Sequence, residues 1–124
     1  MALTTIPGGL QIPSYEFLRL AIDPSTNNLT AIGHKVAAVF KVPSLINNSL
    51  THIGFSTGSI SGTGLSCNVG FQTLDAAYDP TGTNYGGSAP GTVVPTSSAF
   101  FEVALATPAT AVAGNIVAAI IDLT

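Results

Sequence analysis

The feature that most restricts the fold of this chain is a period-two pattern in its central part, in which every second residue is apolar. Alternation with a period of two is typical of β-strands that bury one face. It occurs in residues 34–42, HKVAAVFKV, and again in residues 65–74, LSCNVGFQTL. The predicted inward-facing residues are Val36, Ala38, Phe40 and Val42 in the first stretch, and Leu65, Cys67, Val69 and Phe71 in the second.

Turns rich in glycine and proline separate these stretches from further candidate strands. SISGTG and the residues after Pro43 have turn composition, and Pro108 is expected to break the chain after SAFFEVAL. A short helical turn at residues 110–113 is the one helical element that the pattern allows. Many short strands without a convincing helix indicate a sandwich or a barrel. The sequence therefore predicts an all-β fold, a jelly-roll-like antiparallel β-sandwich formed by residues 31–124.

The first thirty residues differ from the rest. They contain Pro7, Pro13, Pro24 and a Gly-Gly pair, and they keep no sustained period. Residues 15–22, YEFLRLAI, alternate and are predicted to form a strand, with a short helix as the weaker alternative. We interpret residues 1–30 as an extended N-terminal arm that pairs with its own sheet or with a neighbouring subunit.

The last candidate strand, residues 115–123 with the sequence NIVAAIIDL, is apolar on nearly every position. A strand that is apolar on both faces requires cover on both sides. A central strand can be the last one of a chain, but because the sequence ends at Thr124 we expect instead that either a longer product continues beyond it or a neighbouring subunit covers it. An uncovered strand of this composition is prone to aggregation.

The chain carries very few charges. Only 7% of its residues are charged, against about 25% in an ordinary domain. The basic residues are Arg19, Lys35 and Lys41, too few for a nucleic-acid partner. Neither a signal peptide nor an apolar stretch of about 18 residues is visible, so we expect no membrane insertion and assembly in a cytoplasm. Uncharged polar surfaces are common in all-β proteins of large assemblies.

Residues with catalytic or metal-binding chemistry are scattered. His34 and His52 lack a recognisable third zinc ligand, and Cys67 on the apolar side of a strand is interpreted as a small buried hydrophobe. Asp75 and Asp79 are too sparse for a calcium loop of the EF-hand type. Neither a nucleophile elbow nor a phosphate-binding loop occurs. The sequence therefore predicts no enzyme activity, no metal and no cofactor.

The segment with the strongest potential for binding is residues 75–92, DAAYDPTGTNYGGSAPGT. The candidate ligand-binding residues are Tyr78, Asp79, Asn84 and Tyr85, because tyrosine rings and amides on a loop can stack on and hydrogen-bond a sugar. The alternative is that each ring folds back and covers core. Asp79-Pro80-Thr81-Gly82 is predicted to form a type I turn.

Much of the chain resembles a β-sandwich module found in virion proteins of tailed bacteriophages. The resemblance rests on GFSTG, on VGFQTLD, on the segment DPTGTNYGG, and on FFEVAL followed by ATPATAVAGNIVAAII. The upstream stretches GLQIPSYEFLRLAID and AIGHKVAAVFKVP also fit such proteins. The resemblance implies a β-sandwich in a fibre, tail appendage or capsid decoration, and it carries no catalytic residues.

The leading hypothesis is therefore a non-catalytic structural component of a bacteriophage virion that forms a symmetric homo-oligomer with other virion subunits. One alternative is a carbohydrate-binding adhesin that recognises a host-surface glycan through the tip formed by Tyr78, Asn84 and Tyr85. Another is a subunit of a non-viral extracellular filament held together by donated strands. An enzyme is the least favoured interpretation.

Overall fold

The structure, a computed structural model, describes residues 4–6, 10–12, 31–44, 48–58, 60 and 66–124. Its strands confirm the predicted all-β antiparallel sandwich. The elements are β1 (Thr4–Ile6), β2 (Leu10–Ile12), β3 (Lys35–Lys41), β4 (Ser49–Ser56), β5 (Cys67–Leu74), β6 (Pro80–Asn84), the short 3₁₀ turn η1 (Tyr85–Gly87), β7 (Gly91–Val93), β8 (Phe100–Thr110) and β9 (Ile116–Leu123).

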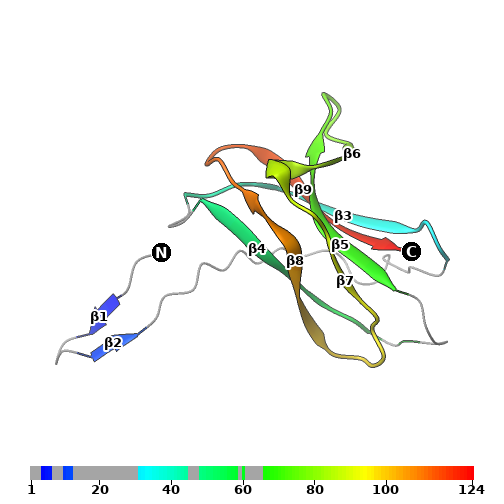
Figure 1. The fold of residues 1–124 in the computed structure, drawn as a ribbon, viewed down its shortest axis with the longest axis horizontal. Coiled ribbons are helices and arrows are strands. Elements are labelled where there is room, and N and C mark those ends of the chain that lie inside the picture. Colours follow the sequence, from blue (N-terminus) through cyan, green and yellow to red (C-terminus); the bar gives the residue numbers. More distant parts are fainter. Residues whose placement is uncertain (1–3, 7–9, 13–30, 45–47, 59, 61–65) are drawn as a thin grey trace.

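Two antiparallel layers form the sandwich (Figure 1). The larger is a five-stranded sheet in the order β3-β9-β5-β6, in which β7 also pairs with β5. The smaller layer is the β4–β8 ribbon, the antiparallel pair formed by β4 and β8. Since β9 occupies one edge of β5, β6 and β7 share the other edge, β7 along Cys67–Val69 and β6 near Leu74. Together they act as one edge strand with an interruption between them.

The core lies between the two layers. The larger sheet contributes alternating residues of β3 and β5, and the rings of Phe40 and Phe71 meet edge to face with centroids 5.8 Å apart. The β4–β8 ribbon contributes Ile53, Val103 and Leu105 from the opposite side. The burial of Phe40, Val69 and Phe71 confirms the inward faces predicted from the period-two alternation.

The final strand β9 corrects one expectation. It is a central strand, paired with β3 on one edge and with β5 on the other. Val117 faces the core, and Ala118 and Ile120 on the opposite face are also buried. The expectation of an uncovered last strand is therefore wrong, because strands of the same chain occupy both of its edges. The burial of Ala118 and Ile120 beside that of Val117 shows that both faces of the strand are covered within this chain.

The end of β8 corrects two further predictions. Pro108 does not break the chain: β8 continues to Thr110, and its pairing with β4 shifts register between Leu50 and His52. A β-bulge of this kind tolerates a proline, because the bulged stretch contributes no regular ladder bonds. The predicted helical turn at residues 110–113 is also absent, since Thr110 ends a strand and a turn follows at Ala113–Gly114.

The predicted N-terminal arm is described only in part. β1 and β2 pair as an antiparallel hairpin, with Ile6 opposite Leu10. The strand predicted at residues 15–22 and the inward position predicted for Leu65 lie outside the described residues. The division into an arm at residues 1–30 and a domain at residues 31–124 stays a prediction.

Candidate functional site

The segment 75–92 contains β6, η1 and the beginning of β7, so it is not a single open loop. Its tip is a tight turn that begins at Asp75, where the Tyr78 amide donates to the Asp75 carbonyl at 3.0 Å. The Asp75 carboxylate oxygen Oδ1 accepts from the amides of Ala77 (2.8 Å) and Asp79 (3.0 Å). The predicted type I turn at residues 79–82 is therefore wrong in position. Asp75 provides the turn-forming carboxylate, and Pro80 begins β6.

Tyr78 lies at this tip with its side chain turned to solvent. Its residue exposure is 59%, and its backbone has a positive φ of 64°. A positive φ is unusual for an aromatic residue, because its Cβ crowds the backbone there. Asp79 follows and is also exposed. Of the four predicted ligand-binding residues, these two are the ones that reach solvent together at the tip.

Tyr85 lies in the hydrophobic core and is 7% exposed. Its hydroxyl oxygen accepts two hydrogen bonds, from the amide of Val112 and from Nδ2 of Asn115, both at 2.9 Å. The ring therefore fastens η1 to the turn between β8 and β9. This is the alternative in which the ring covers core, and in this structure Tyr85 has no face available for stacking on a sugar.

The chain at η1 crosses from the larger sheet toward β8. Gly86 has φ of 63°, and a Cβ on it would overlap the backbone of Thr110. Ser88 is buried and donates its hydroxyl to the Tyr85 carbonyl at 2.7 Å. Ala89 then exchanges two backbone hydrogen bonds with Thr107 of β8. The segment between β6 and β7, residues 85–90, therefore joins the two layers along one side of the sandwich.

Asn84, the fourth predicted residue, lines a shallow hollow on the outer face of the five-stranded sheet. The hollow has a volume of about 80 Å³, well below the several hundred Å³ of a typical ligand pocket. Its floor includes Ile120, and its polar wall includes Gln72, whose Oε1 already accepts from the Gly82 amide at 3.1 Å. The remaining lining residues are Asn68, Gly70, Pro90 and Asp122.

Apart from Asn84, the polar side chains around this hollow were not singled out as binding residues from the sequence. The alternation placed Asn68 and Gln72 outward, but the pairing that brings them beside β9 and Asn84 depends on the sheet order. Most are engaged within the fold: Asn68 Oδ1 accepts from the Thr92 hydroxyl at 2.9 Å. Asp122 lies 3.4 Å from the Lys35 ammonium. The hollow is therefore a surface depression in which the side chains of Asn68, Gln72 and Asp122 are already engaged with residues outside its lining.

Cys67 is buried beneath the same sheet, which confirms its interpretation as a small core residue. Burial, with a further contribution from the Asp122 carboxylate, raises the pKa of the Cys67 thiol. A raised pKa lowers the thiolate fraction at neutral pH, and the thiolate is the reactive form. The environment of Cys67 is therefore unlike that of a catalytic nucleophile.

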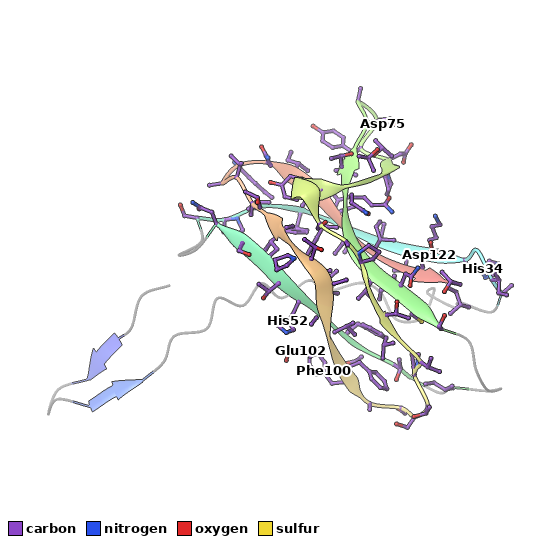
Figure 2. The ribbon with its side chains drawn as sticks, in the orientation of Figure 1. His34, His52, Asp75, Phe100, Glu102 and Asp122 are labelled. Carbon is purple, nitrogen blue, oxygen red and sulfur yellow. The ribbon has the colours of Figure 1, made fainter. Side chains whose placement is uncertain are left out.

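The other titratable residues lie on separate elements. Figure 2 shows His34 and Asp122 near one end of the larger sheet, Asp75 at the far tip, and His52 and Glu102 on the β4–β8 ribbon. The His52 Nδ1 atom lies 2.8 Å from the Thr51 hydroxyl. Among the residues that the structure describes, no three His, Cys, Asp or Glu side chains gather closely enough to hold a metal ion.

Comparisons with known proteins identify no relative of this chain. Within the described part of the chain, no helix has the length and hydrophobicity required to span a bilayer. No protein-family model, no curated protein and no solved structure matches this sequence.

Proposed function

We propose that this chain is a non-catalytic structural subunit of a bacteriophage virion, of the fibre, tail-appendage or capsid-decoration type, that assembles as a symmetric oligomer. The observation that carries the proposal is the state of two edge strands, β3 in the larger sheet and β4 in the ribbon. Within the described residues, no strand pairs with the outer edge of β3 or with the outer edge of β4. Strand edges with unpaired main-chain groups are the usual sites for pairing with another chain.

The composition of the surface supports assembly. With 7% charged residues, the chain has few of the charges that normally keep strand edges apart in solution. Phe100, on the outer face of the β4–β8 ribbon, is 57% exposed, and Val39 on β3 is 46% exposed. Apolar side chains beside open strand edges favour contact with a second subunit. The sequence resemblance to phage virion modules supplies the biological setting of this proposal.

The test is the mass of the purified chain by light scattering over a hundredfold range of concentration, with and without residues 1–30. We expect a defined oligomer of constant mass, and an antibody against it should label purified phage particles. A chain that stays monomeric throughout, in both forms, would contradict the proposal. Truncation separates the two sources of contact: loss of the oligomer assigns assembly to residues 1–30, and retention assigns it to the sandwich.

A second candidate function is an adhesin for a host-surface glycan, favoured by the exposed tip that carries Tyr78 and Asp79. An exposed tyrosine ring beside a carboxylate offers both stacking and hydrogen bonding to a sugar. On a glycan array, Tyr78→Ala should abolish a binding signal of the wild-type chain. Tyr85→Phe is the matched control and should keep that signal, because Tyr85 is buried. Equal signals for wild type and Tyr78→Ala would exclude this tip as the site.

A further inference from the structure

Two strand edges without a partner among the described residues, those of β3 and β4, differ in chemistry. β4, with the sequence SLTHIGFS, contains no lysine, arginine, aspartate or glutamate. β3, with the sequence KVAAVFK, has a lysine at each end. Charged residues, lysine above all, are a common protection of edge strands against pairing with other chains. Of the two edges, β4 is therefore the one without this protection.

The hydrogen-bond alternation shows which residues present the edge of β4. Antiparallel strands alternate between pairs that exchange hydrogen bonds and pairs that do not. The Thr57 amide donates to the Ala99 carbonyl at 2.9 Å. Counting back by two, Phe55 and Ile53 direct their main-chain groups toward β8. The main-chain groups of His52, Gly54 and Ser56 are therefore directed to the open edge.

The same reasoning applied to β3 disfavours pairing with its own copy. The Val42 amide donates to the Asn115 carbonyl at 2.7 Å, so Lys35, Ala37, Val39 and Lys41 direct their main-chain groups outward. An antiparallel pair of two β3 strands that uses all four positions would place Lys35 directly opposite Lys41 of the second copy. Like charges directly opposite are destabilising. β4 has no such conflict in any register.

Gly54 is the middle one of the three residues whose main-chain groups are directed to the open edge of β4. The tip of the Phe100 ring lies directly over Gly54, where a Cβ would meet its Cζ atom. Figure 2 shows Phe100 and Glu102 together with His52 on this ribbon, and Gly54 pairs with Glu102. In a symmetric antiparallel pair centred on Gly54, the two glycines would lie about 5.5 Å apart. The two Phe100 rings would then meet over the symmetry axis.

We propose that two copies of this chain associate through β4, which pairs antiparallel with β4 of the second copy about a two-fold axis at Gly54. His52 of each copy then lies opposite Ser56 of the other. The β4–β8 ribbon becomes one half of a continuous four-stranded sheet, and the exposed Phe100 rings become buried at the axis. This inference rests on the proposed function, since it names the contact through which the structural subunit begins to assemble.

Paired charge substitutions on the full chain test the contact. H52K/S56K places two lysine–lysine pairs opposite each other across the axis, and we expect the dimer dissociation constant to rise about tenfold or more. H52E/S56K changes the same two positions but places glutamate opposite lysine. We therefore expect H52E/S56K to dimerise, in contrast to H52K/S56K. Both positions are exposed, so both variants should keep the wild-type circular dichroism and melting temperature.

A37K/V39K is the matched control, because it adds two lysines to exposed positions of the other edge, and we expect no change in its dissociation constant. Sedimentation equilibrium measures all four proteins. Equal dimerisation of H52K/S56K and wild type, or an equal loss in A37K/V39K, would overturn the β4 contact. A larger oligomer insensitive to the β4 substitutions would overturn it and leave the proposed function standing. A wild-type monomer at every concentration would overturn both.

Discussion

Tyr78 and Tyr85 belong to the same short segment, and the sequence offers no local reason to separate them. Each follows a small or polar residue and precedes a turn former. In the structure, one is 59% exposed at the tip and the other is 7% exposed in the core. The hydroxyl of the buried Tyr85 accepts two hydrogen bonds from distant parts of the chain.

The difference shows that the path of the backbone decides the role of an aromatic residue in this segment. Tyr78 closes a turn that needs only local hydrogen bonds to Asp75. Tyr85 stands where the chain leaves β6 and crosses toward β8, at a point where the two layers must be joined. An aromatic ring with a polar end suits this position, because the ring fills core and the hydroxyl satisfies buried backbone.

The largest expected effect is that of Tyr85→Ala. The change removes a buried ring and two hydrogen bonds, so we expect the free energy of unfolding to fall by about 3 kcal/mol or more. Urea denaturation followed by circular dichroism measures it. Tyr78→Ala is the matched truncation at the exposed position and should change stability by less than about 0.5 kcal/mol. Similar losses for the two variants would contradict the contrast between the tyrosines.

Gly86→Ala tests the close approach beside Tyr85. Gly86 and Gly87 both have positive φ, 63° and 69°, but only Gly86 would bring a Cβ into the backbone of Thr110. We expect Gly86→Ala to cost more than about 2 kcal/mol, and Gly87→Ala about 1 kcal/mol from its backbone conformation alone. Thermal unfolding of the two variants measures the difference. Equal melting temperatures would mean that η1 moves away from β8 without cost.

Tyr85→Phe separates the ring from its hydroxyl. The ring remains, but the amide of Val112 and Nδ2 of Asn115 lose their acceptor. We expect a loss of about 1–2 kcal/mol, because a donor left without a partner in a partly buried place costs its desolvation. Tyr78→Phe is the control and should be neutral. Faster hydrogen exchange at the Val112 amide in Tyr85→Phe would locate the effect.

The sequence predicted the fold class because alternation is a local signal. Phe40, Val69 and Phe71 lie inward, as the period of two requires once one face of each strand is buried. The sequence-based prediction placed the turn at the wrong residues. Asp75 and Asp79 are both suitable turn formers, and the proline after Asp79 favoured Asp79. Proline is also compatible with the first residue of a strand, which is where the structure places it.

The candidate site was predictable only in part. Exposure of the tip near Tyr78 follows from its turn composition. The burial of Tyr85 follows from contacts with Val112 and Asn115, which are far away in sequence and leave no local pattern. The strand edges that carry the proposed assembly follow from the sheet order, because the same alternation fits a central strand and an edge strand.

The smallest expected effect belongs to Tyr78→Gly, and its sign is opposite to the others. Tyr78 has φ of 64°, a conformation that crowds its Cβ and costs about 1–2 kcal/mol. Glycine removes this cost but gains freedom in the unfolded chain worth about 0.5–1 kcal/mol. We therefore expect a net stabilisation of up to about 1 kcal/mol, measured as a higher urea midpoint with unchanged slope. A clear destabilisation would mean that the exposed Tyr78 ring makes stabilising contacts at the tip. Tyr78 and Tyr85 would then differ only in how much their rings contribute to stability.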